Sequence, residues 1–388
     1  MNNTIPNLPE DAAYIAQAIR LASRGLYTSH PNPRVGCVLV KNGKVIGEGW
    51  HQIAGQGHAE VNALEQAQQR GEDTAGATAY VSLEPCSHFG KTPPCADSLI
   101  KAKVARVVSA IEDPNPCVSG NGHRKLREAG IQVSCGLQQA EAAAVNPGFI
   151  KRMQTGIPWV WLKSAMSVDG RTAMASGESQ WITGPEARCD VQRLRARVEA
   201  IITGVESVLH DDPALTVRPE SWHASDCCAH QWPTDFTPIQ PLRVVLDSSL
   251  RMPLSAKMLA LAGETWVVCV QPDPQKQAAL EQAGAKVLVM PDQQGRVDIA
   301  VLLRHLGQAD VNEVLVESGA VTAGAFVDQQ LVDEWWLYMA PSLLGSNARP
   351  VLNLPDMASM AQKRLLTLKD MRQIGNDVRF RYQFKSEN

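Results

Sequence analysis

The sequence predicts a chain of two α/β domains. Its 388 residues exceed one ordinary domain of about 100 to 200 residues. Helix-like and strand-like stretches alternate over residues 58–135, and a second alternation starts at residue 159. A polar stretch with Gly and Pro, residues 146–158, separates the two. We therefore expect one domain over residues 1–150 and another over residues 151–388.

Composition and charge limit the classes of function. Hydrophobic residues make up 44% and charged residues 20% of the chain, as in ordinary globular proteins. The net charge of −3 offers no basic excess for a run of phosphates, so we expect no nucleic-acid partner. The N-terminal segment lacks the basic start and apolar stretch of a signal peptide, and no run of about 18 apolar residues follows. We expect a cytoplasmic protein without a membrane partner, whose nine scattered cysteines are reduced thiols apart from a few that bind metal.

The first half begins with a helix and a hairpin. Apolar residues recur at helical spacing over residues 11–27, before a His-Pro-Asn-Pro break. Residues 35–40 and 45–50 are predicted to pair as antiparallel strands, because Asn42-Gly43 supplies the positive φ values that a type I′ turn requires. The stretches that follow predict a three-layer α/β domain, with helices at 58–70, 94–101 and 120–129 and strands at 77–83, 104–111 and 131–135.

The second half repeats the alternation. Pro185 is well placed for the first turn of a helix over residues 185–200. Further helices are predicted at 275–282, 297–306 and 323–331. Apolar stretches predict strands at 159–165, 201–204, 242–247, 265–270, 286–290, 314–317 and 335–340.

A set of one histidine and two cysteines in the first half predicts a catalytic zinc site. His58-Ala59-Glu60 opens a predicted helix, Pro85-Cys86 follows a predicted strand, and Cys95 starts the next helix. Three protein ligands leave a zinc ion one position for water, whose pKa then falls towards about 7. Glu60 lies two residues after His58, and such positions do not face each other on a helix. Glu60 therefore suits a proton shuttle better than a fourth ligand.

The pattern is similar to the zinc deaminase signature, H-x-E followed by P-C-x-x-C. Its spacing differs, because eight residues rather than two lie between Cys86 and Cys95. In the alternative interpretation, His58 caps a helix and the two cysteines occupy a core. All three pieces in order, with Pro before Cys, favour the catalytic interpretation.

Longer motifs are spread over essentially the whole chain. They are HPNPRVG at 30–36, GWH at 49–51, HAE at 58–60, EPCSHFGKTPPC at 84–95, DPNP at 113–116, SVDGR at 167–171, GESQWIT at 177–183 and DDPALTVR at 211–218. These motifs resemble those of the bifunctional riboflavin-biosynthesis deaminase/reductases, and the long spacing between Cys86 and Cys95 is that family's own.

The resemblance implies a fold and two reactions. It implies a cytidine-deaminase-like three-layer domain followed by a dihydrofolate-reductase-like α/β domain. The first would remove an amino group from a small molecule, a diaminopyrimidinone ribosyl phosphate, by hydrolysis. The second would use NADPH to reduce the ribosyl group to a ribityl side chain. One zinc ion per chain would be held by His58, Cys86 and Cys95, and Glu60 would transfer protons.

The resemblance also implies substrate-binding residues in the deaminase domain. Lys91 suits the phosphate best, because an ammonium group on a flexible stem can follow a dianion. The alternative for each residue of this set is an ordinary polar side chain of a loop. The set is Asn32, His51, His88, Lys91, Asp113 and Asn115.

A further implied set belongs to the reductase domain. The residues that match cofactor positions are Ala165, Trp181, Ser207, Asp211, Ser248, Gly319, Ala320, Val321, Thr322, Ala323, Gly324 and Ala325. Those that match substrate positions are Ser179, Arg195, Leu215, Arg218 and Glu317. Two arginines suit a ribose phosphate, although Arg195 has the alternative of a solvated helix face. We therefore favour Arg218 as the phosphate ligand.

The residues themselves give a weaker indication of a nucleotide cofactor. The second half has no G-x-G-x-x-G turn, so a Rossmann domain is not supported. Small residues over 319–325 follow the predicted strand at 314–317, and such a turn can expose N–H groups to a phosphate. A P-loop is excluded, because Ala-Phe follows Gly324 instead of Lys and Ser or Thr. Tight packing explains these glycines equally well.

One segment departs from the family pattern. Residues 220–240 look inserted, and they contain His223, Cys227, Cys228 and His230. Adjacent cysteines chelate one tetrahedral ion poorly, so we expect no second metal there.

Two other functions stay open at this point. A deaminase acting on nucleic-acid bases shares the zinc signature, although the charge balance and the long cysteine spacing argue against it. The other is a zinc-stabilised binding protein without activity. We also expect the chain to form a homo-oligomer.

Overall fold

The computed structural model describes residues 8–87, 93–116, 118–218 and 238–384. The chain divides into two compact units, Met1–Gly156 and Ile157–Asn388. Residue 150, near which we place the boundary, lies inside helix α6 (Pro147–Thr155). Pro147 favours the first helical turn, and Gly156 ends the helix with a φ of 76° that glycine adopts without strain.

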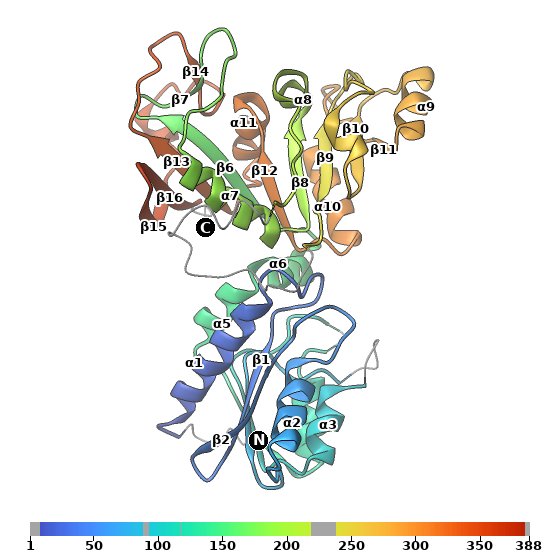
Figure 1. Cartoon of the computed structure of the whole chain (residues 1–388), viewed down its shortest axis with the longest axis vertical. Helices are drawn as coiled ribbons and strands as arrows, with labels where there is room; N and C mark the ends of the chain where they lie inside the picture. Colours follow the sequence, from blue (N-terminus) through green and yellow to red (C-terminus); the bar gives the residue numbers. More distant parts are fainter. Residues whose placement is uncertain (1–7, 88–92, 117, 219–237, 385–388) are drawn as a thin grey trace. The chain divides into compact units, whose positions relative to one another are not determined.

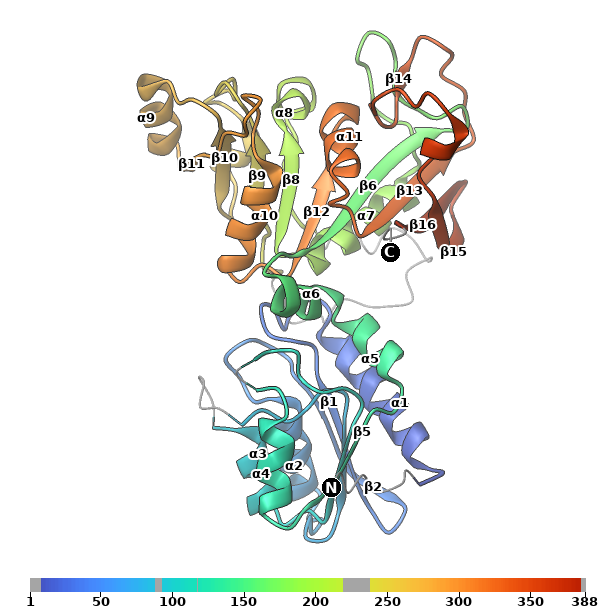
Figure 2. The same ribbon diagram turned by 180° about the vertical axis from the view of Figure 1, so that it is seen from behind.

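The first unit is a sheet covered by helices on both faces (Figures 1 and 2). Its five strands have the order β2-β1-β3-β4-β5, in which β1 is antiparallel to both neighbours and β3, β4 and β5 are parallel. The strands are β1 (Gly36–Lys41), β2 (Lys44–Trp50), β3 (Thr78–Val81), β4 (Arg106–Ser109) and β5 (Gln132–Cys135).

Two apolar cores separate the layers of this unit. Leu99 and Leu126 pack with Leu39 on one face of the sheet, under α2 (Ala59–Gln69), α3 (Cys95–Lys101) and α4 (Asn121–Glu128). Ile15 and Phe149 pack on the other face, under α1 (Asp11–Ala22), α5 (Gln139–Val145) and α6. The predicted three-layer domain is confirmed. The predicted hairpin is also present, with Asn42 at φ 51° and Gly43 at φ 73°.

The second unit is built on a nine-stranded sheet of order β11-β10-β9-β8-β12-β6-β13-β16-β15. All neighbours are parallel except at one edge, where β16 is antiparallel to β13 and β15. The strands are β6 (Trp159–Ser167), β8 (Ala200–Gly204), β9 (Leu242–Leu246), β10 (Thr265–Cys269), β11 (Ala285–Val289), β12 (Glu313–Glu317), β13 (Glu334–Ala340), β15 (Leu366–Ile374) and β16 (Asp377–Phe384), with a separate pair β7 (Arg171–Ala173) and β14 (Arg349–Pro350).

Helices cover both faces of the large sheet, so the second α/β domain is confirmed. Leu302 and Phe326 lie in one core, under α10 (Ile299–Gln308) and α11 (Ala320–Asp328). Leu194, Val208 and Leu280 lie in the other, under α7 (Pro185–Arg197), α8 (Val205–Asp211) and α9 (Pro274–Gln282).

The sequence analysis did not predict α5, α6, α8, β7 or β14, and two further differences have a clear physical reason. Helix α11 starts at Ala320, three residues before the predicted start at residue 323, because its first turn consists of small residues that give little periodic signal. The hairpin β15–β16 was not predicted. β15 is exposed on most positions, so it lacks the alternation of apolar and polar residues that indicates a half-buried strand.

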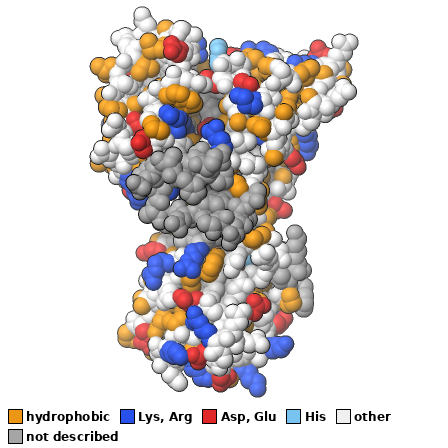
Figure 3. All heavy atoms as spheres, viewed as in Figure 1, with side chains coloured by type: hydrophobic (Ala, Val, Ile, Leu, Met, Phe, Trp, Pro, Cys, Tyr) orange, Lys and Arg blue, Asp and Glu red, His pale blue; other side chains and the backbone are white. Residues whose placement is uncertain are grey.

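Two surface properties bear on function. Among the described residues, no helix combines the length and apolar character needed to cross a bilayer. On the face shown in Figure 3, acidic, basic and apolar side chains of the described residues are interspersed rather than gathered into one basic patch.

Candidate active sites

The first unit brings His58, Cys86 and Cys95 together. His58 is the extended residue that precedes α2, Cys86 follows β3, and Cys95 is the first residue of α3. The His58 Nδ1 atom lies 3.6 Å from Cys86 Sγ and 3.3 Å from Cys95 Sγ. All three candidate ligand atoms lie within 4.8 Å of one another.

This geometry fits a zinc ion. In tetrahedral sites, bonds of about 2.3 Å to sulfur and about 2.0 Å to nitrogen place two such ligands roughly 3.5 Å apart. The Cys95 backbone N–H donates to Cys86 Sγ over 3.3 Å. Hydrogen bonds from Cys95 and His58 lower the pKa of the Cys86 thiol, which favours the thiolate that binds metal.

Glu60 lies beside these ligands but is not part of the set. Its side chain is buried, with 3% of the residue exposed, and it interacts with the Cys95 thiol. Burial, reinforced by the charge of Cys86, raises the pKa of Glu60 to about 7. A carboxyl group with a pKa near neutrality can both accept and release a proton.

His51 lies against the candidate ligand His58, and Asn32 contacts His51. The His51 Nδ1 atom lies 3.1 Å from the Gly57 carbonyl oxygen, which can only accept, so Nδ1 carries the proton. The Nε2 atom of the neutral ring then accepts from the Asn32 amide over 3.1 Å. Burial lowers the pKa of His51, in agreement with a neutral ring. The His51 ring meets the His58 ring edge to face.

Asp113 and Asn115 lie in the segment that follows β4. The Asn115 backbone N–H donates to Asp113 Oδ1 over 2.8 Å. Burial raises the pKa of Asp113 to about 7, and the charges of Glu84 and Cys86 act in the same direction, so Asp113 is within electrostatic reach of the metal-ligand cluster. The predicted substrate residues His88 and Lys91 lie outside the described residues, as do His223, Cys227, Cys228 and His230.

The second unit contains a cavity of about 1360 Å³ beside the carboxyl ends of β8, β9 and β12. It is lined by all five predicted substrate residues, Ser179, Arg195, Leu215, Arg218 and Glu317. It is also lined by most of the predicted cofactor residues, namely Ala165, Trp181, Ser207, Asp211, Ser248, Gly319, Ala320, Val321, Thr322 and Ala325.

Two predicted cofactor residues do not line this cavity. Ala323 is fully buried in the apolar core under α11. A Cβ atom on Gly324 would lie 2.0 Å from the Asn353 carbonyl oxygen, so this glycine allows a close approach of two backbone segments. In this structure, both residues therefore pack against neighbouring segments and do not face the cavity.

Arg195 is held by Glu317. Its guanidinium donates to both carboxylate oxygens, over 2.6 Å and 2.9 Å, and to the Thr216 carbonyl oxygen over 3.2 Å. Burial raises the pKa of Glu317, but Arg195, with smaller contributions from Lys163 and Arg218, more than offsets this and holds that pKa below its usual value. The solvated-face interpretation of Arg195 is therefore wrong. Arg218 is exposed and close enough to Glu317 to affect it electrostatically.

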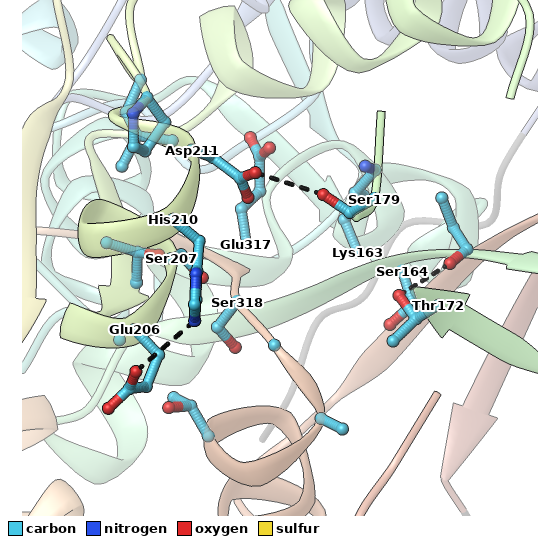
Figure 4. Close-up of a pocket in the computed structure, with 18 of the residues that line it drawn as sticks. Lys163, Ser164, Thr172, Ser179, Glu206, Ser207, His210, Asp211, Glu317 and Ser318 are labelled. Atoms are coloured by element: carbon cyan, nitrogen blue, oxygen red, sulfur yellow. Dashed lines mark hydrogen bonds and ion pairs between the residues drawn. The ribbon is translucent and has the colours of Figure 1, made fainter. Parts of the chain in front are cut away.

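Lys163 is a cavity residue that sequence reasoning missed. It lies opposite Glu317 in the pairing of β6 with β12, and Figure 4 shows both side chains near Ser179 and Asp211, which share a 3.1 Å hydrogen bond. Burial lowers the pKa of Lys163, while Glu317 opposes that shift. The available signal was one lysine within a strand, residues 159–165, whose other residues are apolar apart from Ser164.

The cavity also fits a nucleotide cofactor. The buried hydroxyl groups of Thr203 and Ser318 line it and have no hydrogen-bond partner among the described residues. A Cβ atom on Gly319 would meet nothing within 4 Å, so there is open space at the start of α11, where backbone N–H groups can donate hydrogen bonds to a phosphate. Thr203 lies near the carboxyl end of β8, and Ser318 directly follows β12. In sheets of parallel strands, ligands bind outside these carboxyl ends.

Each unit matches a known family. Residues 8–111 match the cytidine and deoxycytidylate deaminase zinc-binding region. Residues 158–380 match the RibD C-terminal domain.

Similar proteins align over both units. The riboflavin biosynthesis protein RibD of Escherichia coli (strain K12) is 48% identical over 369 residues, which cover 95% of this chain and 98% of that protein. The protein of the same name from Haemophilus influenzae is 44% identical over 96% of this chain and 97% of that one.

Solved structures are also similar over nearly the whole chain. Form 1 of Acinetobacter baumannii RibD superposes with a TM-score of 0.88 at 45% identity, covering 98% of this chain and 100% of that one. A diaminohydroxyphosphoribosylaminopyrimidine deaminase/5-amino-6-(5-phosphoribosylamino)uracil reductase from Thermotoga maritima superposes with a TM-score of 0.80 at 29% identity, over 97% and 99% of the two chains.

The ligand set predicts the metal content of the chain. Elemental analysis should find about one zinc per chain, because one three-ligand set is expected to bind it. Cys86→Ser should abolish binding, whereas the double substitution Cys227→Ser, Cys228→Ser should leave it unchanged. Two zinc ions in the wild type, with one lost in the double variant, would show that residues 220–240 bind metal.

Proposed function

The chain belongs to the family of bifunctional riboflavin-biosynthesis deaminase/reductases, and we propose that each of its two compact units carries out one of the two reactions. Deamination is assigned to the first unit, expected as residues 1–150, and reduction to the second, expected as residues 151–388. The main support is that the His58, Cys86, Cys95 set with Glu60 lies wholly in one unit, whereas the large cavity lies wholly in the other.

For deamination, the substrate is a diaminopyrimidinone ribosyl phosphate. Zinc held by His58, Cys86 and Cys95 supplies the Lewis acidity that makes water nucleophilic near neutral pH. Glu60 accepts a proton from the attacking water and delivers it to the departing amino nitrogen. Asn32, His51, Asp113 and Asn115 orient the pyrimidine and its ribose, and His88 and Lys91 are proposed to join them.

Glu60→Gln tests this proton transfer. The variant keeps the shape of the side chain but cannot carry a proton, so deamination should fall at least about 100-fold. Bound zinc should stay near one per chain, and reduction of deaminated substrate should continue at the wild-type rate. Zinc loss in this variant would identify Glu60 as a ligand and contradict the assignment.

For reduction, the cavity of the second unit aligns cofactor and sugar. NADPH supplies the hydride, so the protein must chiefly position the two molecules and exclude water. Ala165, Trp181, Ser207, Asp211, Ser248 and the segment 319–325 are proposed to hold the cofactor, with Ala323 and Gly324 acting through packing. Ser179, Leu215, Glu317 and Lys163 are proposed to surround the sugar.

Arg195 and Arg218 have different roles in this proposal. Glu317 and Thr216 occupy the guanidinium of Arg195, so Arg195 chiefly fixes Glu317. Arg218 is exposed within the cavity lining and suits the ribose phosphate, which a guanidinium can bind through two hydrogen bonds.

Arg218→Ala should weaken reduction without affecting deamination. Losing a charge-assisted hydrogen bond should lower kcat/KM for reduction by about ten- to a hundredfold. Arg304→Ala is the matched control, because Arg304 is exposed on α10 and does not line the cavity. NADPH oxidation and deaminated product are measured on the same preparation. A parallel fall of both would argue against two separate sites.

The direct test of the overall function is product identification. The purified chain is incubated with the diaminopyrimidinone ribosyl phosphate, and products are identified by mass. Deaminated ribosyl product should form without NADPH, and the ribityl product only with it. Absence of both products would contradict the proposal.

We also propose that the chain self-associates and works in the cytoplasm. Strand β15 is at the edge of the sheet, and it exposes 52% of Leu368 and 60% of Met371, which suits pairing with a second copy. The described cysteines are unbridged, as in a reducing compartment. Light scattering should give a multiple of the chain mass, which Met371→Glu should reduce. A monomeric wild type would contradict the self-association.

A further inference from the structure

A buried carboxylate near the zinc ligands has no part in the mechanism above. Glu84 lies two residues before Cys86, and its side chain is fully buried. Its two oxygens accept hydrogen bonds from four backbone N–H groups. The donors to Oε2 are Asp113, at 3.1 Å, and Gly120, at 3.0 Å. The donors to Oε1 are Gly122, at 2.9 Å, and His123, at 3.2 Å.

Glu84 caps helix α4 from a distant part of the chain. Gly120 precedes this helix with a φ of 72°, and it has no side chain with which to satisfy the first N–H groups. The Glu84 carboxylate takes the place of the usual capping side chain. A Cβ atom on Gly122 would lie 1.9 Å from the Pro85 carbonyl oxygen. The first turn of α4 therefore lies directly against the backbone that leads into Cys86.

The same carboxylate fixes Asp113. The Asp113 N–H is bound to Glu84, and the Glu84 N–H is bound to the Ile111 carbonyl oxygen over 3.0 Å. The segment after β4 is thus held to the segment after β3 by reciprocal hydrogen bonds. One of these segments carries the metal ligand Cys86, and the other carries the substrate residues Asp113 and Asn115.

We propose that Glu84 is the positioning residue of deamination, which sets the substrate-binding segment of residues 113–115 at a fixed place relative to the zinc ligands. The inference rests on the proposed role of Asp113 in substrate binding. Glu84 itself is buried beneath both segments and acts through them.

A nucleophilic role for this cluster is excluded by its geometry. Ser109 Oγ lies 2.7 Å from His123 Nε2, and His123 Nδ1 lies 3.9 Å from Glu84, so the order of residues is similar to a catalytic triad. Ser109 is fully buried, however, and 3.9 Å is too long for the hydrogen bond that orients the histidine. A substrate cannot reach this hydroxyl group.

Glu84→Gln tests the proposal. Glutamine has one carbonyl oxygen, so its NH₂ group must face two N–H donors and two hydrogen bonds are lost. The KM of deamination should rise at least about tenfold. The kcat should change less than about threefold, since Glu60 and the ligands keep their places. Zinc should stay near one per chain, and reduction should be unaffected.

Two comparisons separate positioning from general stability. Asp11→Asn is the matched control, because Asp11 is an equally buried carboxylate of the same unit that binds Leu8, Tyr80 and Arg106. It should lower the unfolding temperature without raising KM. Asp113→Asn should raise KM as Glu84→Gln does, and the double variant should be no worse than Asp113→Asn alone.

The outcomes are distinct. An unchanged KM in Glu84→Gln overturns the positioning role. The role is also overturned if the KM of the double variant rises by the product of the two single-variant factors. An unchanged KM in Asp113→Asn instead overturns the proposed function of Asp113. If the Gln variant loses zinc, Glu84→Asp is tested in its place. We expect it to raise the KM of deamination by a smaller factor. Zinc loss in both variants overturns the proposal, because Glu84 would then act on Cys86.

Discussion

In both units, the candidate site lies at the carboxyl ends of neighbouring parallel strands. In the first unit, β3 leads to Glu84 and Cys86 and the adjacent β4 leads to Asp113, so residues far apart in sequence leave the sheet at one edge. In the second unit, β8, β9 and β12 are neighbours, and the segments after them carry Ser207, Ser248 and Gly319. The pairing of the strands in each sheet thus determines which segments lie together at its carboxyl end, where the site forms.

Three buried glutamates have different proposed functions because their surroundings differ. Burial and the charge of Cys86 raise the pKa of Glu60 to about 7, although His58 opposes the shift, and such a pKa suits proton transfer. Glu317 faces Arg195 and Lys163, and the pairing with Arg195 keeps it ionised. Glu84 meets four N–H groups and organises backbone. Residue type alone does not distinguish these roles, because each depends on the partners that the fold supplies.

The sequence predicted those features that depend on local pattern. The Asn42-Gly43 turn requires positive φ values, and the His58, Cys86 and Cys95 set has a chemistry that few other patterns share. Features that depend on distant partners and have no recognisable motif of their own could not be predicted. Lys163 becomes notable only when β12 places Glu317 beside it, and Glu84 only when residues 29 to 39 positions away donate to it. The β15–β16 hairpin was missed because exposed strands lack a periodic apolar signal.

The central claim is that two chemically separate sites serve two successive reactions. It is tested most directly by removing zinc with a chelator and following both reactions on the same preparation. Deamination should be lost and should return when zinc is restored, while NADPH-dependent reduction of deaminated substrate continues at the rate of the untreated chain. Loss of reduction together with deamination, in a chain whose second unit remains folded, would contradict the account.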